Sequence, residues 1–215
     1  MTSGRVRDDT WLWALLGLAV GLFGVGFVVR WRCTAGACPL AGHLWLLDLD
    51  AVGGLPRLFT TSLFIASTVV AVLAVTRTAG RRALWWTAIA LAGVGLVGAK
   101  LLSAHSVLER TDGAGPTLVG GVVASVLGLP VLAALGRAWR VPGSRDVVLA
   151  LAVYALAALG LDRVTAVVVA LDPHPFAMAA ATTVEELGEA LAALALLAVL
   201  VRRLPERPAR HRSER

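Results

Sequence analysis

Three glutamates lie close together in the last apolar stretch of the chain, at Glu185, Glu186 and Glu189. With Thr182 they follow an i, i+3, i+4, i+7 spacing, so on a helix they form one polar stripe. Carboxylates bind cations or carry protons, and a charged side chain inside hydrocarbon is costly unless it serves a function or has a partner. The stripe is therefore expected to face the interior of a helix bundle or a wet cavity.

Two other apolar stretches carry charged residues at a similar depth. Lys100 and His105 lie near the end of one, with Glu109 just beyond it, and Asp162 and Arg163 lie within the other. At about 1.5 Å of rise per residue, Lys100 lies roughly 9 Å from the outer end of its helix, and Asp162 and Arg163 roughly 12–14 Å. The glutamates lie roughly 13–20 Å in on the same scale. These residues are expected to form one cluster in the outer half of a membrane.

The charges of this cluster do not cancel. Lys100 and Arg163 stand against Asp162 and the three glutamates, two positive charges against four negative ones if all are ionised. Uncompensated buried carboxylates are not tolerated at low dielectric, so either some are protonated or a cation binds there. The structural alternative is that Lys100 and Arg163 each pair with a carboxylate and lock three helices together.

A divalent metal ion is a further candidate ligand. His105 and Glu109 are four apart and share a helix face, so with Glu186 and Glu189 they could supply a metal site. His174, in the loop before the last span, could approach His105. The E-x-x-H spacing of di-iron bundles is missing from the chain, as are H-E-x-x-H, G-x-S-x-G, the Walker loop and the Rossmann fingerprint. No catalytic residue is assigned, and whether the chain is an enzyme stays undecided.

The elements that must position these residues are membrane-spanning helices. Of the 215 residues, 58% are hydrophobic and only 16% are charged, whereas soluble domains carry about 25% charged residues. We expect an all-α, polytopic integral membrane protein, a six-transmembrane-helix bundle. The expected spans are residues 11–29, 59–75, 84–106, 118–139, 147–171 and 176–201.

The arginines predict the orientation of these spans. Arginines are denser on the side that holds the N-terminal segment 1–10, the loops near 77–82 and 137–145, and the basic tail 202–215. The richer side is cytoplasmic by the positive-inside rule, so both termini are expected inside and loop 30–58 outside. The arginine-rich composition, with a single lysine, suggests a bacterial protein of the cytoplasmic membrane.

The outer loop holds both cysteines, Cys33 and Cys38. On the outer side of a membrane disulfides persist, so we expect these two to be joined, with two free thiols or metal binding as the alternatives. The segment His43–Asp50 is too short to span a membrane and is expected to form a short helix along the interface.

Three functions fit these features. The first is a membrane protein whose charged cluster binds or moves a cation, a proton or a small polar ligand. The second is a non-enzymatic subunit or scaffold, whose partner is another membrane protein or a second copy of the chain; the glycine face Gly17, Gly21 and Gly24 suits close helix packing. The third is a membrane-embedded, metal-dependent enzyme acting on a lipid or another hydrophobic substrate. The arginines lie between apolar segments, so nucleic acid is not an expected partner.

Overall fold

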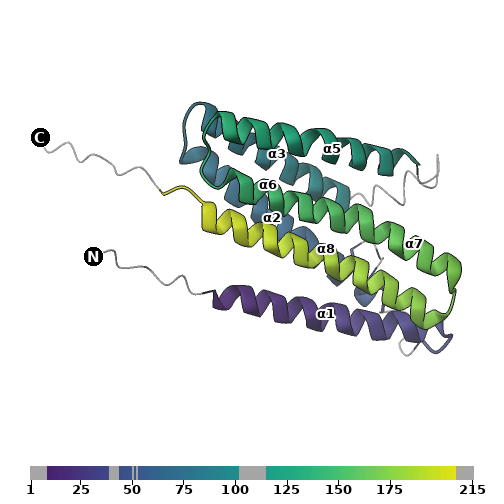
Figure 1. The fold of residues 1–215 in the computed structure, drawn as a ribbon. Helices are drawn as coiled ribbons and strands as arrows, with labels where there is room; N and C mark the ends of the chain where they lie inside the picture. Colours follow the sequence, from purple (N-terminus) through teal and green to yellow (C-terminus); the bar gives the residue numbers. More distant parts are fainter. Residues whose placement is uncertain (1–8, 39–43, 50, 52, 102–114, 207–215) are drawn as a thin grey trace, which may run out of the picture. The chain divides into compact units, whose positions relative to one another are not determined.

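All regular structure in the described part of the chain is helical. The computed structural model describes residues 9–38, 44–49, 51, 53–101 and 115–206 (Figure 1). Its α-helices are α1 (Thr10–Thr34), α2 (Leu55–Thr76), α3 (Arg81–Leu101), α5 (Gly115–Ala138), α6 (Ser144–Leu156), α7 (Asp162–Leu171) and α8 (Pro175–Arg203). A 3-10 helix, η1 (Leu44–Leu47), lies in the loop after α1, and a π-helical turn, η2 (Ala157–Leu161), joins α6 to α7 without a break.

Five helical segments of the described chain are long and apolar enough to cross a membrane. They are Thr10–Thr34, Leu55–Thr76, Arg81–Leu101, Val119–Ala138 and the continuous Ser144–Leu171. Large apolar side chains also lie on their outer surfaces, among them Leu91, Leu127 and Leu156, which are 66%, 63% and 73% exposed. Extended apolar surface of this kind is compatible with a membrane protein, in which lipid covers it.

Helix α8 is long enough to cross a membrane but does not fall among these five. It carries Glu185, Glu186 and Glu189 in its middle and Arg202 and Arg203 in its last turn. The all-helical prediction is confirmed for the described residues, while the count of six spans and their orientation stay predictions.

Several helix ends differ from those expected from the sequence. The first helix runs to Thr34 rather than to residue 29, so Arg30, Arg32 and Cys33 belong to the helix and not to the loop. Long arginine side chains can keep their charge in the interfacial region while the backbone stays helical. The second helix starts at Leu55, four residues earlier than expected; proline is favoured in the first turn, and Pro56 also accepts a hydrogen bond from the Thr60 hydroxyl at 3.2 Å.

The chain divides into two compact units. The first comprises residues 1–60 and 156–194, and the second residues 61–155 and 195–215. In the first unit, Phe23 of α1 and Leu49 after η1 are fully buried and pack with Ala190 of α8. Phe27 and Trp31 of α1 stack with each other, and Phe176 of α8 meets both rings edge-on at 5.6 Å between centroids. These apolar contacts hold α1 to the half of α8 that bears the glutamates.

The second unit has its own aromatic core. Phe64 of α2 and Tyr154 of α6 meet edge-on, with 4.8 Å between their ring centroids. The side chains of Trp85 and Trp86 on α3 are buried, and the Trp85 indole N–H donates to the carbonyl of Leu132 on α5 at 3.0 Å. A buried indole needs such a partner, so this bond fixes α3 against α5.

Candidate functional site

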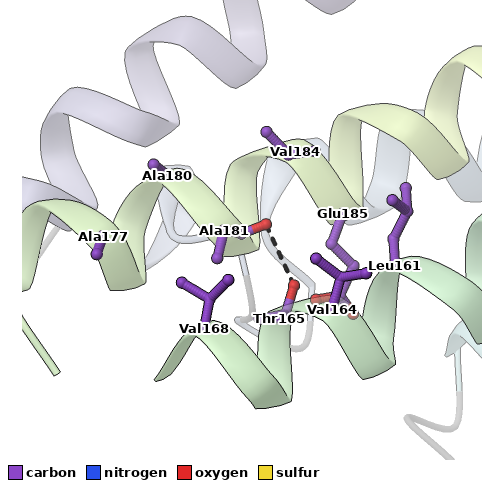
Figure 2. A pocket seen from close by; sticks show the side chains of 9 residues that line it. All are labelled: Leu161, Val164, Thr165, Val168, Ala177, Ala180, Ala181, Val184 and Glu185. Carbon is purple, nitrogen blue, oxygen red and sulfur yellow. Dashed lines mark hydrogen bonds between the residues drawn. The ribbon is translucent and has the colours of Figure 1, made fainter. Parts of the chain in front are cut away.

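A π-helical turn immediately precedes the charged pair of α7. Residues Ala157–Leu161 form the turn, and Asp162 follows at the start of α7. A π turn inserts one extra residue into a helix, which shifts the faces of the two halves relative to each other. Such turns are short and occur often at functional sites. This one turns Leu161, Thr165 and Val168 toward α8 (Figure 2).

The space between α7 and α8 is a pocket of about 300 Å³, entirely within the first compact unit. Figure 2 shows its two walls facing each other. The wall from the π turn and α7 consists of Leu161, Val164, Thr165 and Val168. The wall from α8 consists of Ala177, Ala180, Ala181, Val184 and Glu185. Three of these α8 residues are alanines, whose short side chains leave an open space between α7 and α8.

The polar residues Glu185 and Thr165 lie on the two walls of this pocket, although the surface that lines it is almost entirely apolar. The Thr165 side chain lies beside the Glu185 carboxyl. Its hydroxyl also donates to the carbonyl oxygen of Ala181 at 3.3 Å (Figure 2). Among the described residues, the charged groups that act on Glu185 are Glu186, Asp162 and Glu189, which are all acidic. The surroundings of Glu185 therefore favour a proton or a cation over an anion.

The polar stripe expected on the last helix is present but divides into two parts. Thr182, Glu186 and Glu189 are buried, with only 6%, 5% and 6% of their surfaces exposed. Glu185 is half-buried and faces the pocket. The Thr182 hydroxyl donates to the Met178 carbonyl one turn earlier, at 3.1 Å. Two of the three glutamates are therefore buried inside the protein, and the third lies on the wall of a cavity.

Asp162 and Arg163 lie on the surface of the fold instead. The Arg163 guanidinium lies 3.3 Å from the Asp162 carboxylate, and these side chains are 51% and 39% exposed. Arg163 thus pairs with a carboxylate of the adjacent residue on its own helix, so this pair does not join two helices. Asp162 acts on Glu185 through its charge only.

The remaining residues of the expected cluster stay predictions. Lys100 lies in the last turn of α3, which belongs to the second compact unit, whereas the three glutamates belong to the first. His105 and Glu109 lie outside the described residues. Within the described part of the chain, no group of three His, Cys, Asp or Glu side chains is arranged to hold a metal ion. Of the four residues predicted to bind a metal ion, His105, Glu109, Glu186 and Glu189, only the two glutamates are described, and they do not form such a group with any other described residue.

His174 has a local role at the start of α8. Its backbone N–H donates to the Asp172 carboxylate at 3.2 Å, and its Nδ1 accepts the backbone N–H of Phe176 at 3.3 Å. The first N–H groups of a helix lack partners within the helix, so the imidazole caps α8. The expected partner of His174, His105, lies outside the described residues.

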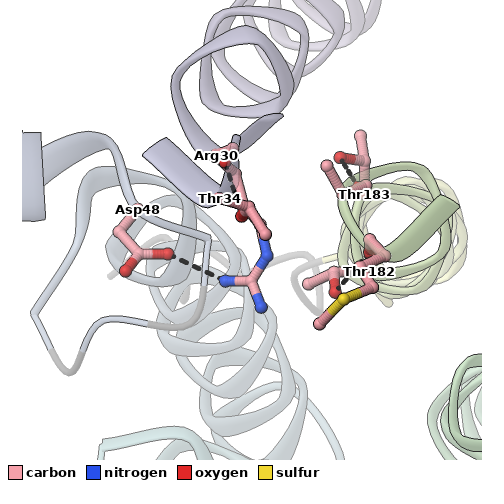
Figure 3. Close-up of polar contacts among 7 residues, drawn as sticks. Arg30, Thr34, Asp48, Thr182 and Thr183 are labelled. Carbon is pink, nitrogen blue, oxygen red and sulfur yellow. Dashed lines mark hydrogen bonds and ion pairs between the residues drawn. The ribbon is translucent and has the colours of Figure 1, made fainter. Parts of the chain in front are cut away.

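The loop that follows α1 is tied to the end of that helix by three contacts. Cys33 and Cys38 form a disulfide, as expected. The Arg30 guanidinium pairs with Asp48 at 3.1 Å (Figure 3). Leu49 packs so closely on Gly26 that a Cβ at residue 26 would come within 2.7 Å of its Cδ2. The segment 44–47 is a short helix, again as expected, and these contacts hold it against α1.

The sequence did not indicate that Thr165 belongs with Glu185 or that a pocket lies beside them. A signal was available in the spacing of Ala177, Ala180 and Ala181, which places three small residues on the helix face that leads to Glu185. The sequence also did not indicate that Gly188 packs against Leu161, although Gly188 follows Glu185 by three residues and so lies near it on the helix surface. Searches of protein-family models, curated proteins and solved structures found no match to this chain.

Proposed function

We propose that this chain is a six-span protein of a bacterial cytoplasmic membrane, with both termini inside, whose carboxylate cluster binds or moves a cation, a proton or a small polar ligand. Helix α8 is the sixth span, and its residues Glu186 and Glu189 face the interior of the protein instead of lipid. Glu185, Glu186, Glu189 and Asp162 bind the ligand. Arg163, Lys100, His105 and Glu109 complete the charged cluster.

The observation that carries this proposal is the position of Glu185. Glu185 lies half-buried on the wall of an apolar pocket, and the charges acting on it among the described residues are acidic. A carboxylate in that position gains from a bound positive charge, since desolvation and like charge both disfavour its bare ionised form.

A hydrophobic carbodiimide tests the proposal directly. N,N′-dicyclohexylcarbodiimide reacts with protonated carboxyl groups in apolar surroundings, and peptide mass spectrometry locates the adduct. We expect an adduct at Glu185 in the full-length protein in lipid nanodiscs. Its formation should slow as the pH rises, and the cation that the site binds should slow it further. An unmodified Glu185 at acid pH, where every carboxyl is most protonated, would overturn the proposal.

The chain supplies a matched control for this experiment. Glu206 follows the end of α8 and is exposed to water, so the apolar reagent should not modify it. Glu185→Gln should remove the adduct, whereas Glu206→Gln should leave the labelling unchanged. Equal modification of Glu185 and Glu206 would show that the reagent does not distinguish a membrane site, and it would count against the proposal.

A second candidate function, a subunit that docks other helices, is favoured by one observation on α1. A Cβ added at Gly17, Gly21 or Gly24 would meet no atom within 4 Å. Small residues at helical spacing let two membrane helices approach closely. If this face binds another helix, Gly21→Leu should weaken co-purification with that partner or with a second, differently tagged copy, while Gly128→Leu on α5, also in open space, should not.

A further inference from the structure

One end of the second compact unit brings together the ends of five helices. Two short turns lie there, one joining α2 to α3 and the other joining α5 to α6. Gly136 near the end of α5 is in close contact with Ser144 of α6 and with Trp85 of α3. The end of α8 joins them, because Arg203 pairs with Asp146 of α6. Segments that are distant in the sequence therefore share one surface.

This surface is strongly basic, and we call it the basic face. Its eight arginines are Arg77, Arg81, Arg82, Arg137, Arg140, Arg145, Arg202 and Arg203, of which all but Arg77 are exposed. The described residues of the same turns and helix ends include only two acidic ones, Asp146 and Glu206, so six positive charges are in excess. Guanidinium groups bind phosphate oxygens through two parallel N–H bonds, so phosphate is a fitting ligand for this face.

Exposed leucines continue from the basic face along two of its helices. On α3, Leu84 follows Arg81 by three residues, and Leu91 lies two turns further along the same side. On α6, Leu149 follows Arg145 by four residues. Residues at these spacings are neighbours on a helix surface. At about 1.5 Å of rise per residue, the α3 stripe runs from a guanidinium through roughly 15 Å of apolar surface.

This order of groups matches a phospholipid rather than a soluble anion. A phospholipid carries its phosphate at the membrane surface and its acyl chains directly below, as the stripes carry an arginine followed by leucines. Long basic side chains near helix ends reach the interface while their helices stay in hydrocarbon. A soluble polyanion would use the arginines and leave the leucines without a partner.

We propose that the basic face binds anionic phospholipids, with the headgroup phosphate at Arg81 and Arg145 and the acyl chains along Leu84 and Leu149. Each arginine near a membrane surface raises the affinity for an anionic headgroup about fivefold. The site uses no residue of the glutamate cluster, so the inference goes beyond the proposed function and needs only that these helices cross a membrane.

Photo-crosslinking tests this inference on the full-length protein in phosphatidylcholine nanodiscs. The probes are phosphatidylglycerol and phosphatidylcholine with the same diazirine-bearing acyl chain, each added in trace amounts, and peptide mass spectrometry locates the adducts. Phosphatidylglycerol should modify residues 84–91 and 149–156 at least about fivefold more than phosphatidylcholine does. Residues 122–127, in the middle of α5, should react equally with both. Equal labelling of all three segments would overturn the inference.

Salt gives a second measurement that needs no variant. The preference for phosphatidylglycerol should fall as sodium chloride is raised from low to high concentration, because dissolved ions screen the exposed guanidinium groups. A preference that does not change with salt would overturn the assignment of the headgroup to the arginines.

Two variants at this end of the unit form a matched pair. Arg145→Gln removes an exposed charge and should lower the preference at residues 149–156 about fivefold, whereas Arg145→Lys keeps the charge and should retain most of the preference. Arg203→Gln/Asp146→Asn removes an ion pair without changing the net charge, so it should leave the preference unchanged. Equal loss in Arg145→Gln and the double variant would overturn the inference, because the packing of the helix ends would then matter instead of the charge.

The outcomes also separate lipid from a soluble polyanion and from the glutamate site. Retention of a labelled DNA oligonucleotide by the protein in nanodiscs, without enrichment of phosphatidylglycerol, would assign the basic face to a soluble polyanion and overturn the inference. Neither Arg145→Gln nor the double variant should change carbodiimide modification of Glu185, so the failure of one proposal is distinguishable from the failure of the other.

Discussion

The Leu161 side chain, at the end of the π-helical turn, occupies the space that the missing side chain of Gly188 leaves on α8. A Cβ at residue 188 would lie 2.5 Å from Leu161 Cδ1, which is closer than two carbon atoms can approach. Leu161 also lines the pocket that contains Glu185. The π turn, the glycine and the pocket beside Glu185 are therefore parts of one packing arrangement.

Gly188→Ala should disturb that arrangement. The new methyl group must displace Leu161, and overpacking of this kind costs about 1–3 kcal/mol, offset by up to about 1 kcal/mol from the better helix propensity of alanine. We expect a lower midpoint of thermal unfolding in nanodiscs and slower carbodiimide modification of Glu185. The double variant Gly188→Ala/Leu161→Ala removes the clash and should recover part of the labelling rate. A Gly188→Ala protein with unchanged stability and labelling would show that α7 and α8 are not packed this closely.

The helices themselves were predictable because long apolar stretches have few alternatives in a membrane. Each backbone N–H and C=O must be paired inside the hydrocarbon, so such a stretch forms a helix. The ends were less predictable. Arg30 and Arg32 looked like loop residues, yet the helix continues to Thr34, because a long basic side chain does not by itself stop a helix.

The site was predictable only in part, because the sequence gives the face of a residue on its own helix but not the neighbour that it meets. The spacing of Thr182, Glu185, Glu186 and Glu189 predicted one stripe; Glu185 is only half-buried, whereas the other three are buried. Nothing in Ala157–Leu161 distinguishes a π turn from an α-helical one, and that turn decides whether Thr165 meets Glu185. The pocket depends on which face of α7 the π turn directs toward α8, so it could not be derived from the sequence of either helix alone.

The pair of Asp162 and Arg163 offers a second prediction, which concerns charge within a membrane span. Its two groups lie 3.3 Å apart on the surface of α7. Removal of one charge leaves the other unpaired in an apolar region, whereas removal of both leaves none. Asp162→Asn and Arg163→Gln should each lower the yield of folded protein in the membrane, and the double variant should recover most of it. The measurement is a double-variant cycle on thermal unfolding, in which additive effects would contradict the pairing.

Gly136 gives a prediction for the second compact unit. A Cβ there would lie 2.6 Å from the Ser144 Cβ and 3.2 Å from the Trp85 indole nitrogen. That nitrogen donates to Leu132, so the methyl group would press on the bond that joins α3 to α5. We expect Gly136→Ala to destabilise the protein by about 1–3 kcal/mol. Gly128→Ala, on the same helix but in open space, should be neutral or slightly stabilising; equal melting of the two variants would contradict the close contact.

The disulfide offers a prediction about orientation. Cys33 and Cys38 are joined, and in the proposed orientation, with both termini inside, the bond lies on the outer side of the membrane. In intact cells, a membrane-impermeant reductant followed by an impermeant maleimide should therefore label both thiols, and labelling without the reductant should fail.

In a Cys33→Ser/Cys38→Ser background, a cysteine placed by Ala79→Cys, in the turn between α2 and α3, should react only after the cells are permeabilised. The loss of the bond should cost the protein about 2 kcal/mol, as expected for such a short closed loop, so the background variant should still fold. Labelling of Ala79→Cys in intact cells, together with protection of Cys33 and Cys38, would reverse the orientation and place the Glu185 pocket in the inner half of the membrane.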